Sequence, residues 1–150
     1  MLSLLFIVYS QLSKNPEIVY VDNNKLFDEF RMTKEMKKIG EKEFNSKKAN
    51  LDSLYIEIQR EDLSQETKEN MMKNFVSKRE EFDQFNQSFA VEESKKIWSR
   101  INSYIKDFSI ENNYELILGS GDNRNILFAN ESKDITNDLL TYINKKYAGL

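Results

Sequence analysis

Few residues of this 150-residue chain have the types and spacing that catalysis requires. The chain contains no cysteine and no histidine, which excludes thiolate nucleophiles, disulfides and the commonest general base. The acidic pairs Glu80-Glu81 and Glu92-Glu93 lie on an expected helix, where adjacent side chains do not face each other, so a carboxylate dyad is not expected. Gly119-Ser120-Gly121 is not followed by the Lys-Ser/Thr of a phosphate-binding loop and predicts a turn. We therefore expect no catalytic, cofactor-binding or metal-binding residues, and we expect the chain not to be an enzyme.

A stripe of phenylalanines is better suited to binding than to chemistry. Phe75, Phe82 and Phe89 recur every seven residues with Phe85 between them, which places the four rings along one face of a helix. The stripe has two interpretations, because the rings can pack against a second helix or contact a bound partner. Helical spacing of this kind favours packing against a second helix.

These rings belong to a long helical stretch, residues 24–113, which contains no proline and a single glycine, Gly40. The stretch is too long for one helix of a globular domain. Its first half also repeats apolar residues every seven positions, as in a coiled-coil seam, at Phe44, Leu51 and Ile58. We therefore predict two helices folded back on each other as a hairpin, with the tip near residues 61–66. Gly40 is a candidate point of bending, because glycine in a helix costs about 1 kcal/mol relative to alanine.

Strand-like segments flank the helical stretch on both sides. Ile18–Val21 precedes it and Tyr114–Leu118 follows it, and the two segments are expected to meet in one sheet. Gly119–Asn123 predicts a turn. Asn125–Ala129 is then a third strand, antiparallel to the second by the logic of a hairpin.

Two shorter helices are expected beside the strands. Leu26, Phe27 and Phe30 form one apolar face after the first strand, and Asp22 or Asn23 is the candidate N-cap of that helix. A last helix follows Ser132, with its apolar face at Ile135, Leu139, Leu140 and Ile143.

The elements together predict an α+β fold. It consists of a small antiparallel or mixed β body with a long inserted α-helical coiled-coil hairpin. Residues 17–150 are expected to form one domain, with the strand body at 17–30 and 114–150 and the hairpin at about 31–113. Residues 1–16 are expected to be a signal-like or disordered N-terminal segment.

Composition limits the compartment and the partners. The net charge is −3, so nothing in the overall charge predicts nucleic-acid binding. The first twelve residues are apolar and uncharged and are too short to span a bilayer. We interpret them as a truncated or atypical export signal, since an apolar core is present but no basic residue precedes it. An N-terminal strand or a disordered lead is the alternative.

The C-terminal third is similar to a known family. The OmpH/Skp family ends in a strand hairpin followed by an Asp-Ile-Thr helix start, and the corresponding segments here are Tyr114–Leu118, Ile126–Ala129 and Lys133–Leu140. Val19–Asp22 followed by Leu26-Phe27 resembles the family's first strand and short helix. The resemblance covers about residues 17–147.

The resemblance implies a jellyfish-like homotrimer in which three helical hairpins surround a cavity. Members of the family are periplasmic, ATP-independent holdase chaperones of unfolded outer-membrane β-barrel proteins. The partners implied are unfolded outer-membrane proteins, two further copies of the chain and an anionic lipid surface, with no cofactor and no nucleic acid.

The resemblance also assigns roles to residues of this chain. Residues near the expected tip are candidate client contacts, because flexible methionines, apolar side chains and lysines suit many weak contacts: Leu63, Met71, Met72, Phe75, Lys68 and Lys73. The apolar strand positions, or their alternates on the opposite face, are expected to be buried in the body and the subunit interface: Ile18, Tyr20, Leu116, Leu118, Ile126 and Phe128.

One alternative function remains. The chain could be a trimeric coiled-coil structural or adaptor protein of the cell envelope that binds one folded partner. That alternative predicts a single specific partner, whereas a chaperone predicts broad, weak and salt-sensitive binding.

Overall fold

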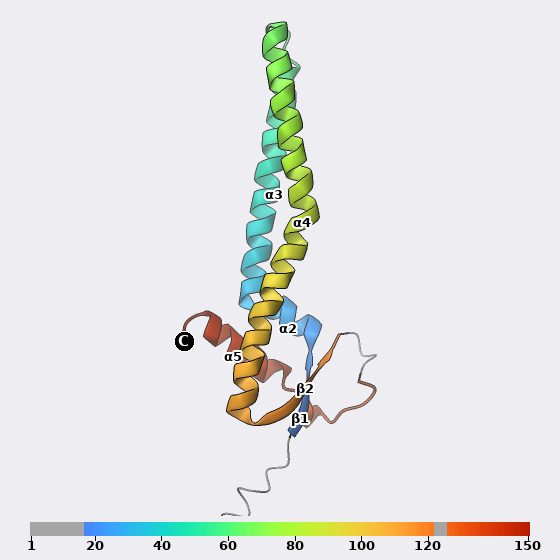
Figure 1. Cartoon of the computed structure of the whole chain (residues 1–150), viewed down its shortest axis with the longest axis vertical. Coiled ribbons are helices and arrows are strands. Elements are labelled where there is room, and N and C mark those ends of the chain that lie inside the picture. The colour runs from blue at the N-terminus through green and yellow to red at the C-terminus, as the bar shows by residue number, and fades with distance from the viewer. Residues whose placement is uncertain (1–16, 122–125) are drawn as a thin grey trace, which may run out of the picture. The chain divides into compact units, whose positions relative to one another are not determined.

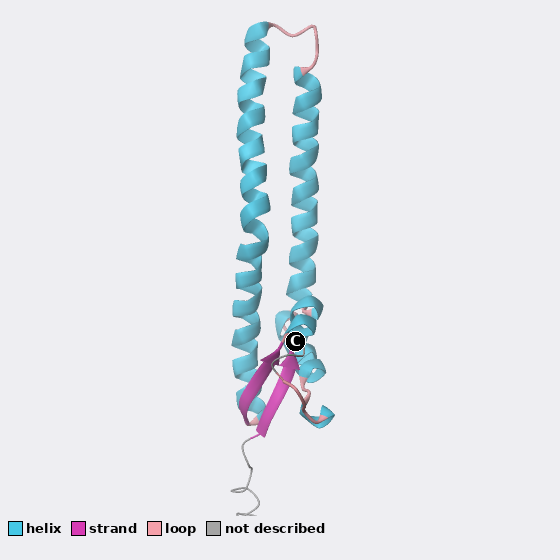
Figure 2. Ribbon diagram, turned by 90° about the vertical axis from the view of Figure 1, so that its right-hand side faces the viewer, coloured by secondary structure: helices cyan, strands magenta, loops and turns pink. Residues whose placement is uncertain are grey.

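The computed structural model describes residues 17–121 and 126–150 (Figures 1 and 2). Its elements, in chain order, are β1 (Glu17–Asp22), α2 (Asn23–Glu29), α3 (Arg31–Ile58), α4 (Gln65–Asn112), β2 (Tyr114–Ser120), the short 3₁₀-helix η1 (Glu131–Lys133) and α5 (Thr136–Tyr147). The export signal predicted within residues 1–16 lies outside the described residues. None of the helices in the described ranges is both long enough and apolar enough to cross a membrane.

The chain divides into two compact units. One contains the chain up to Arg31 together with Trp98–Leu150, and the other contains Met32–Ile97. The first unit holds the strands and α5, and the second holds most of α3 and the first two thirds of α4. The predicted single domain of residues 17–150 stays a prediction.

The sheet has two strands, and they are parallel. β1 pairs with β2 with Val19 opposite Ile117 and Val21 opposite Gly119. The prediction that the segments flanking the helices meet in one sheet is confirmed, but the predicted antiparallel or mixed arrangement is wrong for the described residues. A long connection between two strands permits parallel pairing, and here α2, α3 and α4 form that connection.

The prediction of a third strand is also wrong for those of its residues that the structure describes. Ile126–Ala129 is not a strand, and Asn125 lies outside the described residues. β2 continues instead through Gly119 and Ser120, which pair with Val21 and Asp22. A Cβ atom on Gly119 would lie 2.5 Å from the side-chain nitrogen of Asn23. This glycine therefore lies in β2 and permits a close approach to α2, while residues 122 and 123 of the predicted turn lie outside the described residues.

The core of the strand-bearing unit lies between the sheet, α2, α4 and α5. Its most deeply buried side chains, none more than 4% exposed, are Val19, Val21, Leu26, Phe30, Ile101, Ile135, Leu139 and Ile143. The predicted apolar face of the last helix is confirmed, since all four of its residues are buried. The predicted cap of the short helix is confirmed at Asp22, whose carboxylate accepts hydrogen bonds from the amides of Asn24 and Lys25 at 2.9 and 3.0 Å.

The Asp-Ile-Thr segment ties α5 to β1. The amide of Ile135 donates to the carbonyl of Tyr20 at 3.0 Å, and the amide of Asp22 donates to Oγ1 of Thr136 at 2.9 Å. The carboxylate of Asp134 accepts from both the amide and the hydroxyl of Thr136. Because Ile135 and Thr136 are 4% and 2% exposed, these bonds satisfy backbone groups at a buried junction.

The helical hairpin turns where the sequence predicts. α3 ends at Ile58 and α4 begins at Gln65, so the turn lies within residues 59–64 and overlaps the predicted tip. Ser64 caps α4, because its Oγ accepts from the amide of Thr67 at 3.2 Å. In the turn, Arg60 donates to the carboxylate of Asp62 at 2.7 Å, and this hydrogen bond lowers the pKa of the exposed Asp62.

Candidate functional site

The phenylalanine stripe of α4 packs against α3. The rings of Phe82 and Phe44 lie 5.2 Å apart between centroids, and those of Phe75 and Tyr55 lie 6.3 Å apart. The prediction that the stripe packs against a second helix is therefore confirmed. Heptad spacing brings these rings together, because residues seven apart return to the same face of a helix.

Gly40 lies against an aromatic ring of the facing helix. It is buried, and a Cβ atom there would lie 2.4 Å from the Cε1 atom of the Phe89 ring. The glycine therefore makes room for an aromatic ring of the facing helix, a different role from the predicted point of bending.

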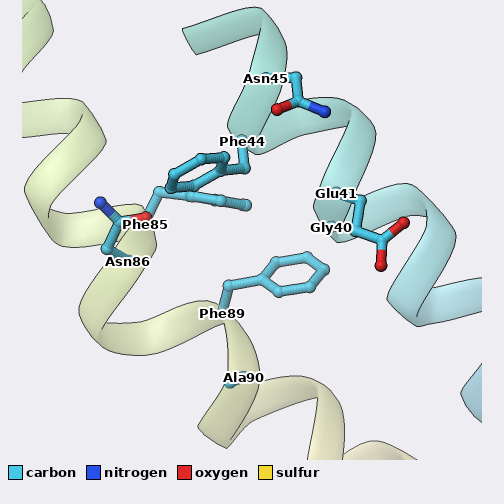
Figure 3. A pocket seen from close by; sticks show the side chains of 8 residues that line it. All are labelled: Gly40, Glu41, Phe44, Asn45, Phe85, Asn86, Phe89 and Ala90. Carbon is cyan, nitrogen blue, oxygen red and sulfur yellow. The ribbon is translucent and has the colours of Figure 1, made fainter. Parts of the chain in front are cut away.

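Two hollows between α3 and α4 adjoin each other on one face of the hairpin. The first has a volume of about 280 Å³, and Figure 3 shows the rings of Phe44, Phe85 and Phe89 lying between the helices with Gly40 facing Phe89. The second has a volume of about 410 Å³ and shares Phe44 with the first. We call their combined surface the aromatic groove; its rings are Phe44, Tyr55, Phe75, Phe82, Phe85 and Phe89.

Charged and amide side chains form the rim of the aromatic groove. Lys48, Asp52, Arg79 and Asp83 surround the second hollow, and Nε of Arg79 lies 3.9 Å from the carboxylate of Asp83. The first hollow is bordered by the carboxylate of Glu41 and the amides of Asn45 and Asn86, with the small apolar Ala90 beside them. Sequence reasoning missed these rim residues, although positions flanking a heptad seam are the signal that would have found them.

The other side of the helix pair is different in character. A third hollow of about 280 Å³ is lined by Asn50, Ser53, Leu54, Glu57 and Lys78 and contains no aromatic ring. Lys48 lines the second hollow and Asn50 lines the third. Because two residues turn a helix by about 200°, the second and third hollows open on opposite sides of α3. The third hollow thus lacks the aromatic rings that line the other two.

The predicted client-contacting residues are only partly brought together. Phe75 lines the aromatic groove, while Leu63 lies in the hairpin turn. The remaining four lie in the first turns of α4: Lys68 and Met71 half-buried, and Met72 and Lys73 exposed. Their contact with a client stays a prediction.

The predicted body residues lie mostly on the outer face of the sheet. Ile18, Leu116 and Leu118 are 52%, 45% and 41% exposed, and Phe128 is 90% exposed; Tyr20 and Ile126 are half-buried. Within one chain the buried positions of β1 are the alternates, Val19 and Val21, at 2% each. The role of the outer face in a subunit interface stays a prediction.

Titratable groups in the described ranges do not gather into a site. No group of three or more Asp or Glu side chains is placed to hold a metal ion in these ranges. The clearest surface cluster joins Tyr142, Glu111 and Lys146: the tyrosine hydroxyl donates to the carboxylate at 2.6 Å, and this bond raises the pKa of Tyr142. Its three members bond to one another and lie outside the aromatic groove.

Comparison with known proteins identifies the family. The chain is similar over 88% of its length to a crystal structure, at 2.83 Å, of a candidate outer membrane chaperone (OmpH-like) from Caulobacter crescentus CB15; 86% of that chain is covered, with 14% identity and a TM-score of 0.49. No curated protein matches. The model of the family described as outer membrane protein (OmpH-like) matches residues 17–143. That range includes both strands, the helical hairpin and most of α5, and the family is one of chaperones rather than enzymes. The chain therefore belongs to the OmpH-like family of outer-membrane-protein chaperones.

Proposed function

We propose that this chain is an ATP-independent holdase chaperone of the periplasm that encloses unfolded outer-membrane β-barrel proteins as a homotrimer. The observation that carries the proposal is the match of the OmpH-like family model over residues 17–143. Chaperones of this family act in the periplasm, and the family implies outer-membrane proteins as clients.

The exposed sheet face supports self-assembly. Ile18, Leu116 and Leu118 expose large apolar side chains on two paired strands, and Leu127 and Phe128 are 93% and 90% exposed in the segment after β2. Neighbouring exposed apolar side chains on paired strands are typical of a protein–protein interface rather than of a monomer's surface. Association of three copies would remove these side chains from water.

The hairpin supports the holding of clients. An unfolded β-barrel protein exposes strands with alternate apolar side chains, which aggregate readily. Half-exposed aromatic rings and flexible methionines offer many weak contacts without ordering the client. No nucleotide is required, because release follows when insertion into the membrane outcompetes these contacts. Exposed lysines of α3 would add weak, salt-screened attraction to acidic client segments or to an anionic lipid surface.

Suppression of aggregation tests the proposal directly. A urea-unfolded outer-membrane β-barrel protein is diluted into buffer, and its light scattering is followed with and without the chaperone. We expect suppression at about one trimer per client, without ATP and weakened by salt. Unchanged scattering at that ratio, or protection of only a single folded partner, contradicts the holdase function.

A further inference from the structure

We propose that the aromatic groove is the surface on which the hairpin holds an extended, uncharged client segment whose alternate side chains are aromatic or aliphatic. This inference rests on the proposed holdase function and assigns the binding surface and the kind of segment within it. The opposite side of the hairpin, around Asn50 and Ser53, then faces away from the client.

The floor of the groove supplies the apolar contact area. Its six rings are only partly used in packing: Phe44 and Tyr55 remain 39% and 58% exposed, and the four phenylalanines of α4 are half-buried. Exposed ring faces accept aromatic and aliphatic side chains with little loss of side-chain entropy, because an aromatic ring has few rotatable bonds. The polar hollow at Asn50 has no ring to offer.

The length of the groove fits one strand of a client. The groove extends along α3 from Gly40 to Tyr55, which is about 22 Å at 1.5 Å per residue. An extended chain covers that length in about seven residues, so three or four of its side chains point into the groove. A transmembrane β-strand has about 9–11 residues, with its lipid-facing side chains on alternate positions.

The charges of the rim select against a charged occupant. Around the second hollow, each helix contributes one cation and one anion: Lys48 and Asp52 from α3, Arg79 and Asp83 from α4. The four charges of the second hollow cancel, and Glu41 is the one charged residue that lines the first hollow, so neither hollow presents the concentrated charge of one sign that would attract a charged occupant. A segment with several charges of one sign would gain no net attraction from this rim, whereas its charges would lose contact with water against the rings of the floor. The apolar side of a membrane-spanning strand is uncharged and meets this requirement.

Charges placed on the rim test the assignment. Asn45 and Asn86 line the groove and are exposed, so Asn45→Glu with Asn86→Glu adds two charges without removing a ring. The matched control is Asn50→Glu with Asn74→Glu, the same chemical change at two exposed positions; Asn50 lines the polar hollow, and Asn74 lies one turn before Lys78, which lines it too. A fluorescent peptide of about ten residues, alternating Tyr or Val with Thr, serves as the client segment.

We expect the groove variant to bind this peptide about tenfold more weakly than the wild type, since an unpaired charge would be brought against apolar side chains. The control variant should bind as the wild type does. Replacing two of the Tyr or Val residues of the peptide, whose side chains point into the groove, by Glu or by Lys should weaken binding to the wild type in both cases. Equal binding by the two protein variants, or tighter binding of either charged peptide, overturns the assignment.

A second measurement locates the bound segment. The chain has no cysteine, so Asn86→Cys and Asn50→Cys each provide one position for an environment-sensitive fluorophore. Addition of an unfolded β-barrel protein should shift the emission to the blue at position 86 and leave it unchanged at position 50. An equal shift at both positions, or a shift at 50 alone, contradicts the groove.

The two proposals fail in different ways. If the wild type suppresses aggregation of the client and the groove variant does so equally well, the holdase function stands and the groove is wrong. If the wild type itself neither suppresses aggregation nor binds the peptide, both are wrong.

Discussion

At the scale of single residues, Gly40 shows how a glycine inside a helix can serve packing. Its missing side chain leaves room for the ring of Phe89, because a Cβ atom added at Gly40 would lie 2.4 Å from Cε1 of that ring. Two effects of a substitution then oppose each other, because alanine favours the helix while its methyl group displaces the ring.

Gly40→Ala should therefore be neutral or mildly destabilising in the wild type, since a helix-propensity gain of about 1 kcal/mol is offset by a packing cost of about 1–3 kcal/mol. In a Phe89→Ala background the ring is absent, and the same change should stabilise by about 1 kcal/mol. Urea unfolding followed by circular dichroism measures all four proteins of this cycle. Equal effects of Gly40→Ala in the two backgrounds would show that the ring does not depend on the glycine.

Thr136 has a defined role at the junction of α5 and β1. Its Oγ1 accepts from the amide of Asp22 at 2.9 Å, and it is 2% exposed. Thr141 is on the same helix, but it is exposed, and its hydroxyl donates to the carbonyl of Asn137 within the helix.

Thr136→Val should destabilise the strand-bearing unit by about 1–3 kcal/mol, because the shape is kept while a buried amide loses its acceptor. Thr141→Val should change the stability by less than about 0.5 kcal/mol, as at most exposed positions. The fluorescence of Trp98, the chain's single tryptophan, reports on this unit, because its ring stacks on Phe27 at 5.4 Å. If Thr136→Val lowers the stability no more than Thr141→Val does, the hydroxyl of Thr136 does not stabilise this junction.

At the scale of elements, aromatic packing differs between the two units. Phe30 is fully buried and contacts the rings of Tyr104 and Tyr147 at 6.4 and 5.4 Å. Phe82 contacts Phe44 at 5.2 Å but is only half-buried. A pair of thin helices buries less of each ring than a layered core does.

Phe30→Ala should cost about 3–5 kcal/mol, as for a fully buried aromatic residue, and Phe82→Ala should cost about half as much because less area leaves water. Unfolding followed by Trp98 fluorescence measures the stability cost of Phe30→Ala. Hydrogen exchange of the backbone amides in residues 32–97 measures the cost of Phe82→Ala. Equal costs for the two changes would contradict the difference in burial.

At the scale of the whole molecule, the outer face of the sheet is the feature that one chain leaves unexplained. Leu118 is 41% exposed on β2 among other exposed apolar side chains, whereas Ile56 is 68% exposed on α3. Of these two side chains, the proposed assembly buries that of Leu118 and leaves that of Ile56 exposed.

Leu118→Glu should shift the protein from trimer toward monomer, because a buried unpaired carboxylate costs several kcal/mol at each of three interfaces. Ile56→Glu should leave the assembly unchanged. Analytical ultracentrifugation at micromolar concentration measures both. If the wild type is a monomer, the proposed homotrimer is wrong. If the Leu118→Glu variant is still a trimer, the interface does not include the outer face of the sheet at Leu118.

Much of this protein was predictable from local patterns in the chain. The hairpin turn near Ser64, the cap at Asp22 and the buried face of α5 each depend on neighbouring residues, whose spacing is visible along the sequence. The packing of the phenylalanine stripe against α3 followed from the same seven-residue repeat on both helices. The residue pattern of the C-terminal third and of the first strand, together with the order of the elements, suggested the family.

The tertiary structure alone decided features that depend on residues far apart. The parallel pairing of β1 and β2 and the continuation of β2 through Gly119 depend on how a distant strand and the side chain of Asn23 meet it. The contact of Gly40 with Phe89 depends on the register between two helices. The aromatic groove also depends on residues far apart in the sequence. A periodic pattern places residues on one face of a helix, but only the packed pair of helices determines which faces enclose a groove and which remain in water.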